Sequence, residues 1–297
     1  ADFNKIKSRF SHLKKRTIII AAVVLVLVLA FAYWWFHPAI NIQSIDLWGF
    51  LIVILALVTF VLFVFRQIYQ TGMGKREKSP KKVKLFSGLM AIPIAIAVIG
   101  AVGWLASQSF FPGNAEKYST VLVTEDADFA TDIPEVNYSE IPFIDKDSAI
   151  LLGNRTMGTM ADYVSQFEIS DLYSQINYKG QPVRVSPLNY ADFFKWWANK
   201  DGGIPAYVIV NMSTQDTEIV RLENPIRYSD SDPFFYNVDR HVQLSYPFYM
   251  FDEKSFEIND DGEPFWIYPV QKRTIGLFGG TTIQRVVLCN ASTGECQ

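Results

Sequence analysis

The chain has 297 residues, of which 49% are hydrophobic and 19% charged, and its formal net charge is −3. These totals fit either one large globular domain or a membrane part followed by a modest domain. Residues 1–106 carry 13 basic and 3 acidic side chains, whereas residues 107–297 carry 14 basic and 27 acidic ones. The acidic second part argues against nucleic acid as a partner, because no basic surface there could neutralise phosphates.

Three apolar runs predict transmembrane helices, at about residues 17–36, 47–66 and 85–107. At 1.5 Å per residue, each run is long enough to cross roughly 30 Å of hydrocarbon. A cleaved signal peptide is the alternative interpretation of the first run. We expect the run to be kept as an anchor, because its apolar core is too long and "FAYWWFHP" lacks the small residues of a cleavage site.

Basic residues predict the orientation of these helices. They concentrate in the N-terminal residues 1–16 and in the loop 66–84, and positively charged loops stay in the cytoplasm. We therefore expect a multi-pass protein of the cytoplasmic (plasma) membrane, with its N-terminus inside and its C-terminal domain outside. Four tryptophans are expected at the outer membrane–water interface as anchors: Trp34, Trp35, Trp48 and Trp104.

Apart from Arg66 at the end of the second run, the apolar runs hold no Asp, Glu, Lys or Arg, which argues against transport by this chain alone. Ala97 and Ala101 form a small-xxx-small pattern that favours packing against another helix. The expected partners are the lipid bilayer and an envelope or membrane protein, and a homo-oligomer stays open. An accessory subunit of a multi-subunit membrane complex is the alternative function that this pattern favours.

Residues 108–144 are expected to be a linker, and residues 145–297 an extracytoplasmic α+β domain with an antiparallel sheet. Helices are predicted at 148–167 and, capped by Asn189, at 189–200. "YKGQ" predicts a hairpin turn. The similar stretches "GIPAYVIV" and "GEPFWIYPV" indicate an internal duplication, with related units at about 145–225 and 226–297.

The strand "PFWIYPV" followed by "VVLCNASTGEC" resembles the PepSY-type module, an α+β unit found outside the bacterial cytoplasmic membrane. The whole chain is similar to membrane-anchored envelope proteins of Gram-positive bacteria. The motif match covers mainly Gly203–Leu222 and Gly262–Glu295. The resemblance implies a non-catalytic binding or inhibitory module that acts on envelope proteins or peptidases. The "GLFGG" excursion departs from a simple module, which puts any particular partner in doubt.

No catalytic, cofactor-binding or metal-binding residues are assigned, and we expect no enzyme. His241 is the only histidine after residue 107, and no Gly-x-Ser-x-Gly elbow accompanies it, so it is interpreted as structural. "DSDSD" and "NDDGE" do not follow the spacing of a calcium loop. Acidic residues are so abundant that no carboxylate pair can be selected, and an envelope hydrolase stays as a third hypothesis.

Cys289 and Cys296 flank the turn "NASTGE" and are expected to form a structural disulfide, with free thiols as the alternative. The aromatic residues are expected in the core rather than on a binding surface; these are Phe193, Phe194, Trp196, Trp197, Tyr207, Phe265, Trp266 and Tyr268. The sequence therefore favours an interaction or regulatory protein. Whether Gln297 is the native end stays open.

Overall fold

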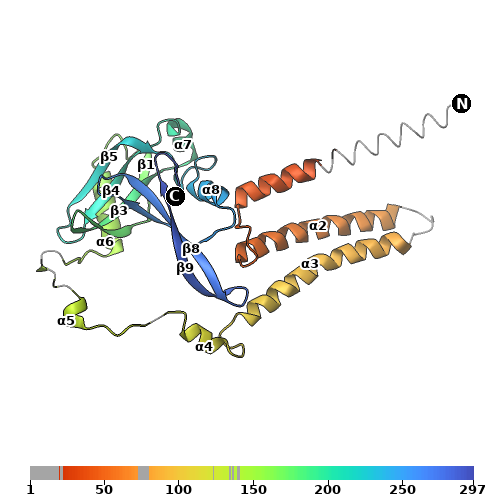
Figure 1. The fold of residues 1–297 in the computed structure, drawn as a ribbon. Helices are drawn as coiled ribbons and strands as arrows, with labels where there is room; N and C mark the ends of the chain where they lie inside the picture. The colour runs from red at the N-terminus through yellow and green to blue at the C-terminus, as the bar shows by residue number, and fades with distance from the viewer. Residues whose placement is uncertain are drawn as a thin grey trace. The chain divides into compact units, whose positions relative to one another are not determined.

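The computed structural model describes residues 20, 23–72, 80–122, 124–133, 135, 137–138 and 141–297. The chain divides into two compact units, residues 1–38 and residues 39–297. Residues 23–36 of the first unit are helical. The second unit contains all the labelled helices and strands of Figure 1.

The second unit opens with two long helices, α2 (Ile45–Gly72) and α3 (Pro80–Ala106), which pack against each other. Ser44 begins α2, because its hydroxyl accepts a hydrogen bond from the backbone N–H of Leu47. A Cβ atom at Gly100 would lie 3.0 Å from the ring of Trp48. The absence of a side chain at this glycine therefore lets the two helices approach closely.

Among the described residues, no helix combines the length and the apolar character that crossing a membrane requires. The prediction of three transmembrane helices, at 17–36, 47–66 and 85–107, is therefore corrected, and so is the multi-pass location in the cytoplasmic membrane. The prediction relied on counting uncharged residues, and the observed helices follow other boundaries. Helix α3 begins at Pro80, inside the basic segment. The basic residues 1–16, which the predicted orientation depends on, lie outside the described residues. In the loop 66–84, residues 73–79 also lie outside them, and the side chains of the other loop residues are not described.

The role of membrane-interface anchor stays a prediction for the four tryptophans, and the structure shows what surrounds each ring. Trp34 and Trp35 lie on the helix of the first unit, with ring centroids 6.2 Å apart. Trp48 donates a hydrogen bond to the carbonyl of Ile42 and packs edge-on against Phe278. Trp104 is exposed on α3. At Trp48, contacts within the protein thus account for the position of the ring.

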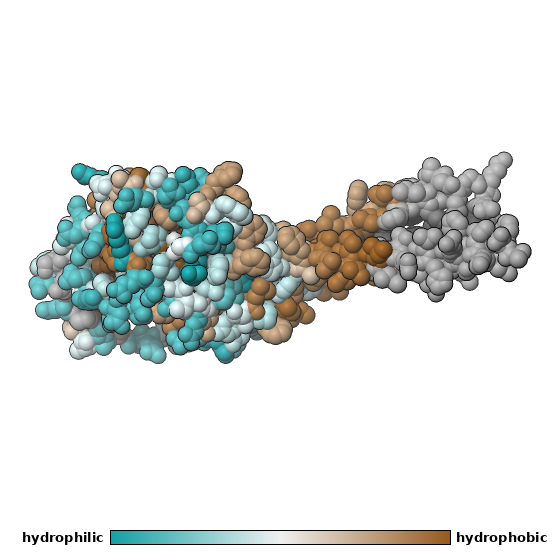
Figure 2. Space-filling view, turned by 90° about the horizontal axis from the view of Figure 1, so that it is seen from above, coloured by the Kyte–Doolittle hydropathy of each residue, from teal (hydrophilic) through white to brown (hydrophobic). Residues whose placement is uncertain are grey.

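Large apolar side chains of α2 and α3 are exposed. Figure 2 shows that hydrophobic colour is concentrated in one part of the molecule. Ala97 is half-buried and Ala101 is exposed. Gly100, where α2 and α3 approach closely, lies between these two alanines in the sequence.

The predicted linker contains two short helices, α4 (Asn114–Ser119) and α5 (Phe129–Asp132). Helix α6 (Lys146–Met157) follows and is capped by Asp145, whose carboxylate accepts a hydrogen bond from the N–H of Ser148. The helix predicted at 148–167 is therefore too long. The chain turns at Gly158 instead, and Phe167 already belongs to a strand.

The first sheet is antiparallel throughout. Its strands are β1 (Phe167–Ile169), β2 (Ser174–Tyr178), β3 (Gln181–Tyr190), β4 (Ile204–Asn211) and β5 (Thr217–Ile226). They lie in the order β1-β3-β4-β5, with β2 also paired to β3, and α6 packs on β1, β4 and β5. The predicted "YKGQ" hairpin is confirmed, because Lys179 and Gly180 both have positive φ between β2 and β3.

The second sheet is also antiparallel. It consists of β6 (Met250–Phe251), β7 (Ser255–Ile258), β8 (Pro264–Ile275) and β9 (Gly279–Asn290), with β8 paired to the other three. Helix α8 (Val238–Ser245) precedes it. One hydrophobic core spans both sheets, and Tyr207 of β4, Phe256 of β7 and Trp266 of β8 are among its fully buried members. The two sheets therefore fold around shared apolar contacts.

The "GLFGG" segment forms the tip of the β8–β9 hairpin and contacts the end of α3. The fully buried hydroxyl of Ser107 accepts hydrogen bonds from the N–H groups of Leu277 and Phe278, at 2.9 and 3.0 Å. The same hydroxyl donates to the carbonyl of Gly103. Tyr118 of α4 donates to the carbonyl of Ser107 at 2.7 Å. The excursion thus joins the helical pair to the second sheet.

Candidate functional site

Seven aromatic residues lie together on the second unit and define what we call the aromatic surface. Four come from α7 (Phe193–Asn199) and three from the turn that follows β5: Phe193, Phe194, Trp196, Trp197, Phe234, Phe235 and Tyr236. Trp196 is the buried centre, with its ring centroid 5.3 Å from those of Phe193 and Phe234. The rings of Phe193 and Phe194 are 5.9 Å apart, so the contacts extend outward from Trp196.

Most of the outer rings are exposed to solvent. The exposed fractions are 51% for Phe193, 78% for Phe194, 62% for Trp197 and 79% for Phe235. Single exposed apolar residues are ordinary, but a contiguous set of this kind is a candidate interaction surface. The sequence prediction that these aromatic residues belong to the core is therefore wrong for Phe193, Phe194 and Trp197. It is correct for Trp196, Tyr207, Trp266 and Tyr268, which are buried.

A pocket of about 410 Å³ lies within the aromatic surface. Its lining is mainly apolar and comes from both segments: Trp196, Trp197, Lys200, Asp201, Asp232, Phe234, Phe235 and Tyr236. Lys200 and Asp201 pair with each other at 3.1 Å, and the Lys200 ammonium lies 5.5 Å from the Trp197 ring centroid. The charges of this pair balance, and an uncharged, apolar occupant fits the pocket best.

A carboxylate holds the two halves of the aromatic surface together. Asp232 is buried, and its Oδ2 accepts a hydrogen bond of 2.7 Å from the indole N–H of Trp196. Its Oδ1 accepts from the backbone N–H groups of Phe234 and Tyr236, at 2.8 and 3.2 Å. These three bonds use the carboxylate within the protein, so it is not free to receive a polar ligand.

The turn that presents Phe235 is fixed from its other side by helix α8. Asn237 caps this helix by accepting a hydrogen bond from the N–H of Arg240. The buried guanidinium of Arg240 donates in turn to the carbonyl of Phe234. Burial lowers the pKa of Arg240, and the nearby carboxylates of Asp232 and Asp239 oppose that shift. The backbone of the turn that carries Phe235 is therefore hydrogen-bonded to the side chains of both Asp232 and Arg240.

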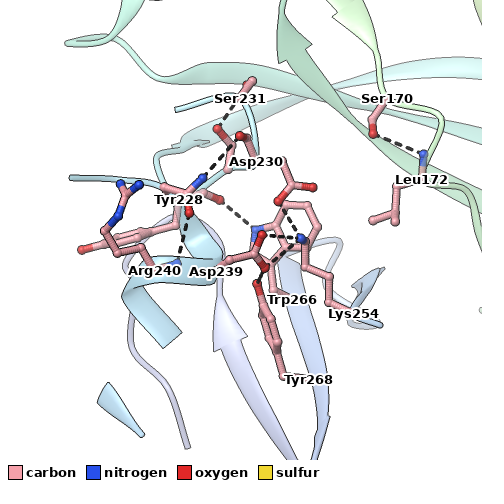
Figure 3. Close-up of polar contacts among 12 residues, drawn as sticks. Ser170, Leu172, Tyr228, Asp230, Ser231, Asp239, Arg240, Lys254, Trp266 and Tyr268 are labelled. Atoms are coloured by element: carbon pink, nitrogen blue, oxygen red, sulfur yellow. Dashed lines mark hydrogen bonds and ion pairs between the residues drawn. The ribbon is translucent and has the colours of Figure 1, made fainter. Parts of the chain in front are cut away.

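A lysine and two carboxylates connect α8 and the segment before it to the second sheet (Figure 3). The Nζ atom of Lys254 lies 2.7 Å from Asp230 Oδ1 and 2.8 Å from Asp239 Oδ1. Burial lowers the pKa of Lys254, but the two carboxylates and their hydrogen bonds outweigh it, so the pKa is raised. Burial raises the pKa of Asp230, and Lys254 only partly offsets it. The lysine is therefore held charged between two acids.

Two aromatic residues of β8 complete this cluster. Tyr268 donates a hydrogen bond of 2.7 Å to Asp239, and Trp266 donates one of 2.8 Å to the carbonyl of Tyr228. Burial raises the pKa of the Tyr268 hydroxyl well above its usual value, and the charge of Asp239 adds to the effect. The hydroxyl therefore remains a neutral donor. The cluster as a whole positions the chain that leads from β5 to the aromatic surface.

His241 and the two cysteines lie together and do not line the aromatic pocket. Cys289 and Cys296 are joined in a disulfide. The imidazole Nε2 of His241 is 2.7 Å from the carbonyl of Gly294, within the turn that this disulfide closes, and its ring lies 4.3 Å from that of Tyr228. These contacts give His241 a structural role, because its ring holds the C-terminal turn on α8.

The described residues contain no group of three or more histidine, cysteine or carboxylate side chains suited to a metal ion. Asp230 and Asp239 are bridged by Lys254. Asp232 is bonded to Trp196. These three carboxylates are therefore all engaged by neighbouring side chains.

The sequence contains one signal that could have indicated the aromatic surface. "FFKWW" places four large aromatic side chains in a helix of seven residues. A helix buries one face, and consecutive aromatic residues at 193–194 and 196–197 cannot all point to that face. Some of them must be exposed. "PFFY" at 233–236 gives no comparable signal, because Phe234 contacts α7 through Trp196, far away in the sequence.

No family model matches the chain, and no curated protein or solved structure is significantly similar to it. The resemblance to the PepSY-type module is therefore neither supported nor refuted and stays a prediction. Function is inferred from the site alone.

Proposed function

We propose that this chain is a non-catalytic interaction protein that binds a protein partner through the aromatic surface. The observation that carries the proposal is the exposure of Phe194, Trp197 and Phe235 around an apolar pocket. Aromatic side chains dominate the binding energy of protein interfaces, because each buries a large area at a small cost in conformational entropy.

The chemistry of the pocket supports an apolar protein segment as its occupant. A sugar would need free donors and acceptors beside the rings, whereas Asp232 is bonded within the protein and Lys200 is paired with Asp201. A nucleic acid would need a positive surface, and residues 107–297 are acidic. A peptide or protein surface that supplies leucine-like or aromatic side chains needs neither free hydrogen-bonding groups nor a positive surface.

The rigidity of the frame supports the same proposal. Asp232 and Arg240 bond the turn that carries Phe235, and Asp232 also bonds to Trp196. A surface already held in its binding shape loses little conformational freedom when a partner binds. The polar cluster around Lys254 extends this frame into the second sheet.

The test compares the partners recovered with the full-length protein and with single variants. Trp197→Ala and Phe235→Ala should each reduce recovery of a specific partner at least about 10-fold, the effect of removing an aromatic hot spot. The matched control is Phe248→Ala, since Phe248 is 63% exposed but does not line the pocket. Quantitative mass spectrometry of purified complexes gives the readout.

Two outcomes decide the matter. A partner whose recovery depends on Trp197 and Phe235 but not on Phe248 supports the proposal. Identical recovery with all three variants would show that the aromatic surface is not the binding site.

A further inference from the structure

A second cavity, of about 450 Å³, lies where the two sheets meet. Its lining comes from β2, β4 and β5 of the first sheet and from the β7–β8 turn and the end of β9 of the second. Cavities at the junction of packed layers are common ligand sites. This cleft shares no lining residue with the aromatic pocket, so a ligand here would be independent of binding at the aromatic surface.

A tyrosine hydroxyl without a partner lines this cleft. Tyr207 of β4 is only 1% exposed, and among the described residues its hydroxyl makes no hydrogen bond. This hydroxyl is not one of the fully buried polar atoms that lack a partner in the described part of the chain, so it is accessible from the cleft that Tyr207 lines. Burial raises the pKa of Tyr207 to about 12, so the phenol is neutral near pH 7. The hydroxyl is therefore available to a ligand.

A glycine keeps open the space in front of this hydroxyl. Gly262 has a φ of +83°, and a Cβ atom built on it would lie 3.3 Å from the hydroxyl of Tyr207 and 3.6 Å from that of Tyr178. The two phenol oxygens thus converge on the same small volume. Any other residue at this position would partly fill that volume and would also be strained by the positive φ.

The second phenol oxygen already has a cationic neighbour. The ammonium of Lys179 lies 4.8 Å from the ring centroid of Tyr178, and the Tyr178 hydroxyl is the main cause of the raised pKa of Lys179. Tyr207 therefore offers the free oxygen, and Tyr178 bounds the space beside it.

The charged residues that line the cleft determine which ligand charge it favours. Glu223, Asp261 and Glu263 line it with one basic residue, Arg221. Lys179 and Asp260 lie just outside the lining, and their opposite charges balance. The excess of two negative charges in the lining favours a cation.

The rest of the lining favours an organic cation over a metal ion. The described carboxylates do not form a metal-ion cluster. Val220, Leu222 and Pro264 provide an apolar wall, against which the carbon stem of an organic cation can lie.

We propose that this cleft binds a primary ammonium group on an aliphatic stem, with the ammonium between the hydroxyl of Tyr207 and the carboxylates at the rim. A lysine side chain of a partner and a free alkylamine both carry this chemistry. The phenol oxygen of Tyr207 accepts one N–H of the ammonium. The stem lies along the apolar wall.

The experiment titrates the full-length protein with n-butylamine, followed by chemical shifts or calorimetry, with n-butanol and butanoate as matched ligands. Saturable binding of the amine alone is the expected result. Tyr207→Phe should weaken it about 10-fold, the effect of losing one hydrogen bond to a charged group. Asp261→Asn should weaken it by a smaller factor, and Asp126→Asn, which lies outside the cleft, should leave it unchanged.

The stability of Tyr207→Phe separates a lost binding site from a damaged fold. Because the hydroxyl bonds to no described residue, removing it should leave the thermal unfolding midpoint unchanged or slightly raised. Butylamine that binds Tyr207→Phe as tightly as the wild type would overturn the proposal, and so would equal binding of butanoate or no saturable binding at all. A tripeptide, acetyl-Ala-Lys-Ala-amide, then distinguishes the two sources, because tighter binding than butylamine indicates a lysine of a partner.

Discussion

At the scale of single residues, Lys254 contributes to the fold through its charge. Its side chain is 14% exposed, and it lies between Asp230 and Asp239, whose side chains are 32% and 42% exposed. A lysine in this position satisfies two carboxylates that would otherwise repel each other. Its ammonium also lies 5.7 Å from the Trp266 ring centroid. Loss of this one charge would therefore affect several neighbours.

We predict that Lys254→Met destabilises the protein by about 2–3 kcal/mol, less than a fully buried pair because both acids are partly hydrated. The loss arises because Asp230 and Asp239 lose their shared cation, and Asp239 keeps only the hydrogen bond from Tyr268. Urea unfolding of the full-length protein measures it. Adding Asp230→Asn to Lys254→Met should restore part of the stability, since it removes one of the unpaired charges.

The control for this prediction is Lys200→Met. The pair of Lys200 with Asp201 is exposed, with Asp201 almost fully so, and exposed pairs contribute about 0–1 kcal/mol. Equal destabilisation by Lys200→Met and Lys254→Met would contradict the role given to the buried cluster.

At the scale of elements, β9 extends into a turn that is tied to the strand and to α8. Leu288 and Gln297 exchange two backbone hydrogen bonds, at 3.0 and 2.9 Å, and the Cys289–Cys296 disulfide lies beside them. Tyr246, the residue that ends α8, donates to the carbonyl of Cys296, and His241 contacts that of Gly294. The disulfide is thus one of several restraints on a short loop.

We predict that Cys289→Ala together with Cys296→Ala lowers the free energy of unfolding by about 2 kcal/mol, the chain-entropy value for so short a loop. The sheets should persist, because the hydrogen bonds of the turn remain. Urea unfolding with and without a reducing agent provides the measurement. The reductant should lower the stability of the wild type to that of the variant and leave the variant unaffected; a variant as stable as the oxidised wild type would refute the prediction.

At the scale of the whole molecule, buried tyrosines link the stability of the shared core to pH. Burial raises the pKa of both Tyr190 and Tyr207 from 10.0 to about 12, and that of Tyr268 well above its usual value. In the unfolded chain these groups lose their protons from about pH 10. Between about pH 10 and 12 the unfolded state therefore binds fewer protons than the folded state, and stability falls as the pH rises.

We predict a flatter alkaline decline for Tyr207→Phe than for the wild type. Removing one such group should reduce the slope of unfolding free energy against pH by up to about 1.4 kcal/mol per pH unit. Urea unfolding at intervals from about pH 9 to 12 gives the slopes. Tyr138→Phe is the control, because that side chain is 93% exposed and its surroundings change little on folding. Parallel curves for the wild type and both variants would refute the assignment.

Local patterns of the sequence predicted parts of the fold well and long-range contacts poorly. The hairpin at Lys179–Gly180 was predictable, because a turn of this type requires residues that tolerate positive φ. The helix predicted from Asn189 was misplaced, since Asn189 belongs to β3 and Asp192 is the cap. Both residues are suitable caps, and only the pairing of β3 with β1 decides between them.

The candidate sites were less predictable than the strands. The bond between Trp196 and Asp232 joins residues 36 positions apart, and the hydroxyls of Tyr178 and Tyr207 meet at Gly262, beside a different sheet. Nothing local to these residues indicates which of them come together. The prediction of three transmembrane helices was wrong for the opposite reason, because it depended only on local runs of uncharged residues.

The contact between Ser107 and the tip of the β8–β9 hairpin bears on the order of folding. Its two hydrogen bonds join residues 170 and 171 positions apart, and the chain between them includes all of the first sheet. Closing so long a loop is entropically costly until the intervening strands have formed. The helical pair and the sheets can therefore each acquire structure early, before the contacts of Ser107 and of Trp48 with the hairpin tip join them.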